Sequence, residues 1–200
     1  AHHRFFPGTD KYFTPFLSPN QNRALNPKEV RDVLPENNEG IYIVPQILTN
    51  QADFFLRAAK ELKECYGYEE VNLNLGCPSG TVVSKGKGAG FLADPGGLDA
   101  FFDQVYAKAD VKVSVKTRIG LSSPEEFYGI LDIFNRYPLH ELIIHPRVRN
   151  DFYKNKPNRE IFAEAVRLSK NPLCYNGDIF TLADYADFGR EFPAVGKVML

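Results

Sequence analysis

Short apolar segments rich in β-branched residues recur along the chain, and segments with apolar positions at helical spacing separate them. The first pattern predicts seven strands: Lys11–Phe16, Ile41–Ile47, Glu70–Leu75, Val111–Thr117, Glu141–His145, Leu173–Asn176 and Gly196–Leu200. The second predicts five main helices: one from a Thr49 or Asn50 cap to Gly67, Leu98–Lys108, one opened by a capping box at Ser123 and Glu126, Glu160–Ser169, and Leu182–Phe192 capped by Thr181. The pattern therefore predicts a chain of repeated strand–helix units.

Repeated strand–helix order is compatible with an open doubly wound sheet and with a closed barrel. The strands are evenly spaced, and no dinucleotide-type glycine fingerprint follows the first of them, which favours a (β/α)8 TIM barrel in the α/β class. Such barrels usually contain about 250 residues. The chain has 200 residues, and its last predicted strand runs to Leu200. We therefore expect residues 1–200 to form one incomplete barrel domain.

Composition is that of an ordinary globular domain, with 44% hydrophobic and 24% charged residues and a net charge of −1. No apolar run approaches the roughly 20 residues of a membrane span, and we find no secretory leader. Cys65, Cys77 and Cys174 show neither CxxC nor histidine pairing at zinc spacing. We therefore expect free thiols, no metal, no membrane association and a cytoplasmic location.

Positive charge is unevenly distributed. The segment from Arg147 to Arg159 contains five basic residues against Asp151 alone, and Lys85 and Lys87 lie in a glycine-rich loop. Both clusters follow predicted strands, so they could line one face. A solvated surface explains this pattern as well as a phosphate-contacting patch does.

The most informative motif is Asn72–Pro78, followed by a loop that contains Gly80, Gly86, Gly88 and Gly90. An apolar strand delivers Cys77 to its carboxyl end, and glycines let the backbone fold over a flat ligand. The loop matches neither the Walker A spacing nor the dinucleotide fingerprint. We interpret it as a mobile cover of an active site.

Polar residues end five successive predicted strands, where barrel enzymes collect their catalytic groups. They are Gln46; Asn74 and Cys77; Lys116 and Arg118; His145 and Arg147; and Asn176, Gly177 and Asp178. Each type has a simpler explanation, such as a solvated lysine, a core histidine, an ordinary turn or a packing thiol, and we assign Cys65 and Cys174 to packing. Five polar strand ends in succession are harder to explain by solvation and favour an active site.

At these residues the chain resembles the tRNA-dihydrouridine synthase family of flavoproteins. The matching segments follow the family's order: Pro45–Ile47, Asn72–Pro78, Gly88–Pro95, Ser114–Gly120, Ile144–Arg147 and Tyr175–Ile179. The resemblance implies an enzyme that uses FMN and NADPH to reduce the C5=C6 bond of uridine in tRNA. We expect it to be a monomer.

The resemblance also implies residue roles. Gln46, Lys116 and His145 correspond to contacts of the FMN ring and ribityl chain, and Asn176, Gly177 and Asp178 to part of its phosphate site. Asn74 corresponds to the residue that holds the target uracil, with Arg118 and Arg147 as further contacts to substrate or cofactor, and Cys77 to the proton donor. Because an ordinary thiol has a pKa of about 8.5 and is mostly protonated at neutral pH, we expect an acid rather than a nucleophile there.

The chain departs from the family pattern in three places. Pro146 stands where the family usually has glycine, which removes an N–H that could bind FMN. The family's first strand and its C-terminal helical tRNA-binding domain are not in this sequence, so we expect a barrel truncated at both ends. Two alternatives remain: a flavin-dependent dehydrogenase of a free pyrimidine, similar to dihydroorotate dehydrogenases, and a barrel that binds RNA without turnover.

Overall fold

The computed structural model describes residues 2–5 and 8–200, and within them one sheet of six parallel strands follows the order of the sequence. The strands are β1 (Tyr12–Leu17), β2 (Ile43–Ile47), β3 (Glu70–Leu75), β4 (Lys112–Arg118), β5 (Glu141–His145) and β6 (Leu173–Tyr175). The α-helices are α1 (His2–Phe5), α2 (Pro27–Val33), α3 (Ala52–Tyr66), α4 (Gly80–Val83), α5 (Pro95–Tyr106), α6 (Glu126–Phe134), α7 (Arg159–Leu168) and α8 (Leu182–Glu191). Three 3-10 turns are η1 (Pro35–Asn37), η2 (Gly88–Ala93) and η3 (Arg149–Asp151).

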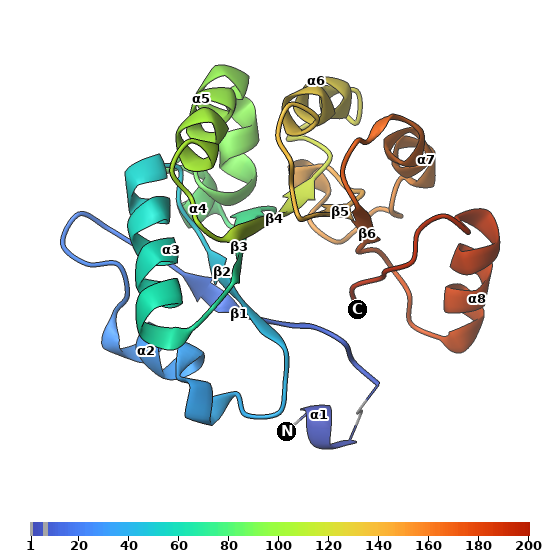
Figure 1. The fold of residues 1–200 in the computed structure, drawn as a ribbon. Helices are drawn as coiled ribbons and strands as arrows, with labels where there is room; N and C mark the ends of the chain where they lie inside the picture. Colours follow the sequence, from blue (N-terminus) through green and yellow to red (C-terminus); the bar gives the residue numbers. More distant parts are fainter. Residues whose placement is uncertain (1, 6–7) are drawn as a thin grey trace.

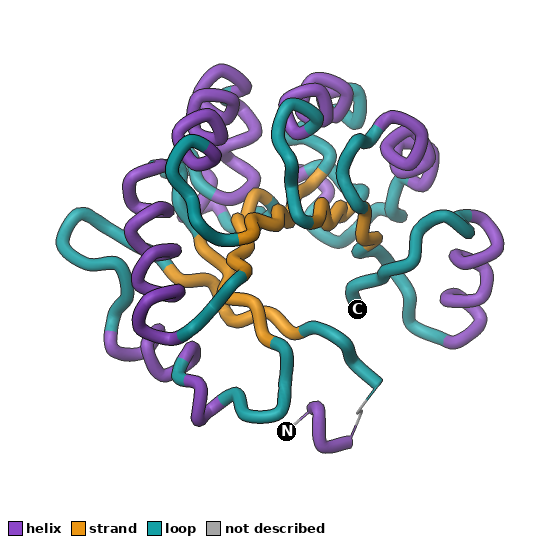
Figure 2. The backbone as a smooth tube through the Cα atoms, in the orientation of Figure 1, coloured by secondary structure: helices purple, strands orange, loops and turns teal. Residues whose placement is uncertain are grey.

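The sheet is curved, and the helices α3, α5, α6, α7 and α8 lie along its outer side (Figures 1 and 2). A doubly wound sheet would reverse its strand order and carry helices on both faces. The observed order never reverses, and no pairing joins β1 to β6 among the described residues. The architecture is therefore α/β with the topology of a truncated TIM barrel.

The core lies between the strands and the outer helices. Every position of β3 and of β5 is buried, as expected for parallel strands covered on both faces. Aromatic side chains join the helices over this sheet: Phe101 on α5 contacts Phe55 on α3 and Phe91 in η2, each with ring centroids 5.6 Å apart. This packing holds α3, η2 and α5 against one another beside the loop that follows β3.

Six of the seven predicted strands are confirmed, each with bounds within two residues of those expected. The seventh, Gly196–Leu200, is wrong as a strand. Val198 forms only an isolated parallel bridge with Tyr175, because two backbone hydrogen bonds alone join this segment to β6. The helix α2 was missed, although Asn26 and Glu29 form its capping box.

Several helix starts also differ from the predictions. The helix α5 begins at Pro95 after its Asp94 cap, three residues before the expected Leu98. The helix α3 begins at Ala52 after Gln51, one residue beyond the expected caps, while its predicted end is confirmed because Gly67 takes the left-handed conformation (φ 76°). The helix α6 begins at Glu126, not directly after Ser123. The Glu126 carboxylate accepts backbone N–H bonds from residues 121–123, whereas the Ser123 hydroxyl contacts Glu125 instead of capping the helix.

Within the described residues, no helix has the length and apolar character that crossing a membrane requires.

Candidate active site

A cavity of about 500 Å³ opens at the carboxyl ends of the strands and brings all ten predicted site residues together. Sequence reasoning missed four large side chains that also line it. The predicted set is Gln46, Asn74, Cys77, Lys116, Arg118, His145, Arg147, Asn176, Gly177 and Asp178, and the missed set is Phe13, Phe16, Tyr153 and Met199. The structure thus places all ten predicted residues around one cavity, whereas the role of each residue remains a prediction.

The turn that carries Cys77 is held by the side chain of Asn74. The Asn74 Oδ1 accepts hydrogen bonds from the backbone N–H of Gly76 (3.1 Å) and of Cys77 (3.0 Å). The thiol-bearing residue itself is half-buried at the cavity wall. We call residues 76–78 the cysteine turn.

The glycine-rich segment after the cysteine turn is packed rather than open. It folds into α4 and η2, and Gly88, Ala89 and Gly90 are buried. A Cβ added to Gly88, whose φ is +55°, would lie 2.9 Å from the Cβ of Cys77. Lys85 is exposed and Lys87 is half-buried, and neither lines the cavity. The interpretation of this segment as a mobile cover is therefore corrected: its glycines are buried against the cysteine turn, and neither lysine reaches the cavity.

Lys116 on β4 presents a cation to the cavity. Burial and the neighbouring charge of Arg118 lower its pKa to about 8. In the described part of the chain no hydrogen-bond acceptor or carboxylate contacts its ammonium group. A half-buried ammonium that faces the cavity without a partner fits an electron-rich ligand, such as the N1/C2-carbonyl edge of a flavin.

Arg118 ties two loops together across the cavity. Its guanidinium donates to the carbonyl oxygens of Gly76 (2.9 Å), Val148 (3.1 Å) and Phe152 (2.8 Å), and it lies 5.2 Å from the ring centroid of Tyr153. Only 2% of the residue is exposed. Its visible role is therefore to hold the cysteine turn against the loop after β5.

His145 is a neutral imidazole in a basic surrounding. Burial, together with the charges of Arg118 and Lys116, lowers its pKa to about 4. The Nδ1 lies 2.7 Å from the carbonyl oxygen of Asn176, which can only accept, so Nδ1 carries the proton. The Nε2 lies 3.4 Å from Arg147 Nη1.

Side-chain contacts and close packing fix the turn of Asn176, Gly177 and Asp178. The Asn176 side chain donates to the carbonyl of Met199 (3.0 Å), and Asp178 pairs with Arg147. A Cβ at Gly177 would overlap the hydroxyl group of Tyr175. The predicted start of the next helix is confirmed: α8 begins at Leu182 after its Thr181 cap, so the turn of residues 176–178 does not directly precede it. Any phosphate here would meet the turn itself rather than a helix N-terminus.

The basic segment after β5 forms part of the cavity rim. Phe152 has φ +51°, which is strained for a residue with a side chain, and the next residue, Tyr153, is 69% exposed. Tyr153 packs edge-on against His145 at a centroid distance of 5.9 Å. Lys154 and Lys156 are exposed on the same loop. The aromatic residue within a run of basic ones was the available signal for this missed position.

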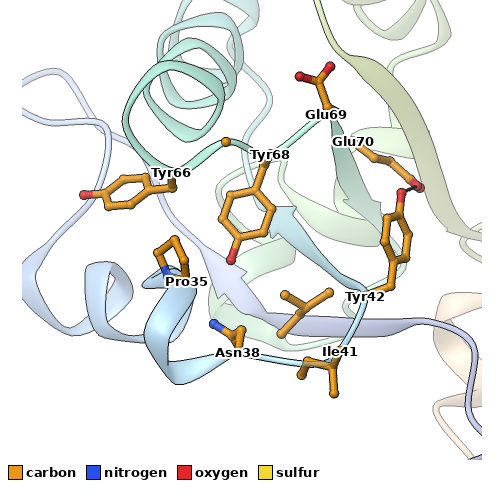
Figure 3. Close-up of a pocket in the computed structure, with 10 residues that line it drawn as sticks. Pro35, Asn38, Ile41, Tyr42, Tyr66, Tyr68, Glu69 and Glu70 are labelled. Atoms are coloured by element: carbon orange, nitrogen blue, oxygen red, sulfur yellow. Dashed lines mark hydrogen bonds between the residues drawn. The ribbon is translucent and has the colours of Figure 1, made fainter.

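A second cavity, of about 270 Å³, lies at the opposite ends of β2 and β3 (Figure 3). Figure 3 shows the Tyr42 hydroxyl reaching the Glu70 carboxylate, to which it donates at 2.8 Å. Lys11 pairs with both Glu70 (3.0 Å) and Glu141 (3.4 Å). Burial raises the pKa of Glu70, but the bonds from Tyr42 and Lys11 outweigh it, so the net pKa lies below its ordinary value. The ion pairs of Lys11 therefore link the amino-terminal ends of β1, β3 and β5.

The remaining cysteines differ from each other. Cys174 is buried in β6, as expected for a packing thiol. Cys65 is exposed on α3, so its assignment to packing is wrong. The helix pattern placed Cys65 next to core positions, but its side chain lies outside the apolar stripe.

A curved parallel sheet with a basic, polar cavity at its carboxyl ends defines the class of α/β-barrel proteins that bind their ligands at this rim. The family model described as Dihydrouridine synthase (Dus) matches residues 4–197. The chain belongs to this family.

Curated relatives agree with the family assignment. The chain is 29% identical over 157 residues to a probable tRNA-dihydrouridine synthase 1 of Synechocystis, a match that covers 77% of this chain and 42% of the relative. It is 28% identical over 176 residues to a probable tRNA-dihydrouridine synthase 2 of Bacillus subtilis, covering 85% and 54% respectively. A tRNA-dihydrouridine(16) synthase of Vibrio vulnificus is 31% identical over 124 residues, covering 59% and 38%. The chain thus spans about half the length of the curated relatives it matches.

Proposed function

We propose that the protein is an FMN- and NADPH-dependent tRNA-dihydrouridine synthase, and that residues 1–200 are most of its catalytic barrel domain. The observation that carries the proposal is the convergence of all ten predicted residues on one cavity of a chain that belongs to the dihydrouridine synthase family. A monomeric state and a cytoplasmic location stay predictions.

The residues fit a bound flavin in distinct ways. Lys116 would meet its electron-rich edge, since the ammonium faces the cavity and has no partner within the described structure. Gln46 and His145 would line the ring and ribityl chain, and the turn of residues 176–178 would meet the phosphate. Because Asp178 already neutralises Arg147, the phosphate would depend on backbone N–H groups more than on that arginine.

The chemistry needs a hydride and a proton on opposite carbons of one double bond. FMN, reduced by NADPH, would supply the hydride to C6 of the uracil ring. Cys77 would deliver the proton to C5 from its thiol, and Asn74 would hold the uracil beside it. Arg118, which donates hydrogen bonds to three backbone carbonyls, would shape the cavity wall next to Cys77. The exposed Lys154 and Lys156 would contact the RNA backbone.

Flavin binding by the purified full-length protein tests the cofactor part of this proposal. We expect FMN to bind with quenching of its fluorescence, and we expect Lys116→Met, which keeps the length of the side chain without its charge, to weaken binding about tenfold or more. Lys85→Met is the matched control, because Lys85 is exposed and does not line the cavity. Equal FMN affinity in both variants would contradict the assignment of Lys116.

Turnover separates the alternatives. Oxidation of dihydroorotate without any reduction of tRNA uridine would favour a dehydrogenase of a free pyrimidine. Binding of tRNA without any turnover in the presence of FMN and NADPH would favour an RNA-binding barrel. Only reduction of tRNA uridine agrees with the proposed function.

A further inference from the structure

Four buried polar side chains form an unbroken line of hydrogen bonds through the sheet to the cysteine turn. The Asn72 Nδ2 donates to Ser114 Oγ (3.0 Å), and the Gln46 Nε2 donates to Asn72 Oδ1 (3.0 Å). The Asn74 Nδ2 donates to Gln46 Oε1 (2.7 Å). Each of the four residues is at most 8% exposed. We call this line the amide relay.

The direction of the amide relay is fixed at the cysteine turn. Backbone N–H groups can only donate, so the atom of Asn74 that meets Gly76 and Cys77 must be its oxygen. The Asn74 Nδ2 then faces Gln46, which presents its own oxygen. The Gln46 amide nitrogen must therefore face Asn72.

The direction is fixed independently at the other end. The Ser114 hydroxyl lies beside two groups that can only accept, the carbonyl of Val71 (3.4 Å) and the carboxylate of Glu70. Once its single proton is donated to either, the Ser114 oxygen must accept from Asn72. Both ends therefore require the same orientation of every amide. Rotating one of these side-chain amides by half a turn would place two oxygens opposite each other, and two N–H groups opposite each other, in the buried interior.

We propose that Asn72 and Ser114, neither of which lines the cavity, are positioning residues that hold the cysteine turn in place through Gln46 and Asn74. The catalytic consequence rests on the proposed function, in which Cys77 delivers a proton. The geometric consequence does not, because it concerns only the turn. A corollary follows for Asn74: its oxygen already accepts two bonds and one N–H is used, so it offers a ligand one N–H donor and can meet a carbonyl oxygen.

Alkylation of Cys77 by iodoacetamide in the full-length protein tests this proposal. Mass spectrometry of the two peptides gives the rate at Cys77 relative to that at Cys65, which is exposed on α3 and serves as an internal reference. We expect Asn72→Leu to loosen the turn and raise this ratio about fivefold or more, as the loss of roughly 1 kcal/mol of hydrogen bonding implies.

Asn171→Leu is the matched control. Asn171 is also buried and also makes two hydrogen bonds, from Leu139 N–H (3.0 Å) and to Phe134 O (2.9 Å), but it does not belong to the amide relay. We expect this variant to lose stability while the alkylation ratio stays at the wild-type value. A rise equal to that in Asn72→Leu would mean that general loosening, and not the relay, controls the turn, and would overturn the proposal.

A milder pair of variants decides the question if Asn72→Leu does not fold. Ser114→Ala removes the acceptor at the end of the relay and should raise the ratio, whereas Ser114→Thr keeps a hydroxyl group and should leave it near wild type. Equal ratios in Ser114→Ala and wild type, with native circular dichroism, would overturn the proposal. Because alkylation needs no turnover, this result stands apart from the proposed function, which fails only if tRNA uridine is not reduced.

Discussion

The guanidinium group of Arg147 makes two parallel hydrogen bonds to the carboxylate of Asp178, at 2.9 and 2.6 Å. Arg147 follows β5 and is 4% exposed, whereas Asp178 belongs to the turn after β6. Charge-assisted pairs of this two-pronged kind fix orientation as well as distance. This pair therefore joins two neighbouring loops at the cavity and holds Arg147 beside His145.

Removing the anion of this pair should destabilise the protein. In Asp178→Ala the Arg147 guanidinium stays buried without its carboxylate, and we expect the free energy of unfolding to fall by about 2 kcal/mol, less than for a fully buried pair because Asp178 is partly exposed. Urea unfolding measures the change. Asp187→Ala is the control: its partner Arg190 is exposed, and we expect a loss below about 0.5 kcal/mol. Equal losses in both variants would contradict a structural role for the Arg147–Asp178 pair.

His145 should make the free energy of unfolding depend on pH under acidic conditions. Its pKa of about 4 in the folded protein lies below its ordinary value of 6.5, so the unfolded chain binds more protons between these values. Stability is therefore full above about pH 6.5 and falls as the pH drops toward 4. We expect His145→Gln to remove about 2 kcal/mol of this pH dependence, measured as the difference in unfolding free energy between pH 7 and pH 4.5. A pH dependence identical to that of wild type would contradict a neutral, buried imidazole.

Gly88 should tolerate no side chain without moving Cys77. A Cβ there would lie 2.9 Å from both the Cβ and the carbonyl oxygen of Cys77, in a left-handed backbone conformation. We expect Gly88→Ala to destabilise the protein by about 1 to 3 kcal/mol and to lower turnover further than that loss explains.

Gly129→Ala is the matched control for this substitution. Gly129 lies in α6 with nothing within 4 Å of an added Cβ, so alanine should stabilise the helix by about 0.5 to 1 kcal/mol and leave turnover unchanged. Thermal unfolding and the rate of tRNA reduction measure both variants. Full turnover in Gly88→Ala would show that the close contact does not position the thiol.

The sequence pattern predicted most of the fold because local rules decide it. β5 carries the apolar run Leu142–Ile144 and is buried along its whole length, as such a run predicts. β3 alternates apolar and polar residues and is also fully buried, because Asn72 and Asn74 find hydrogen-bond partners inside the protein. The segment 196–200 looks the same locally but has few partners, and partners are a tertiary property that periodicity does not contain. The helix α2 could have been found, because Asn26 before Pro27 and three residues before Glu29 is a capping signal.

The candidate site was predictable where residues follow strands and hidden where they depend on contacts across the sheet. Lys116 and His145 were found because each ends an apolar run. Nothing in the sequence indicated that Arg118 bonds to three carbonyls, or that Asn72 and Ser114 are linked, since these contacts join different strands. The sequence pattern predicts where the strands lie, but only the structure shows where the side chains on them point.

The central claim is that Cys77 donates the proton in the reduction of tRNA uridine, and mass spectrometry of cellular tRNA tests it most directly. A strain that lacks the protein is complemented with wild type, with Cys77→Ala, or with Cys65→Ala, which removes an exposed thiol that does not line the cavity. We predict that dihydrouridine returns with wild type and with Cys65→Ala but not with Cys77→Ala. Dihydrouridine at the wild-type level in the Cys77→Ala strain would contradict the account.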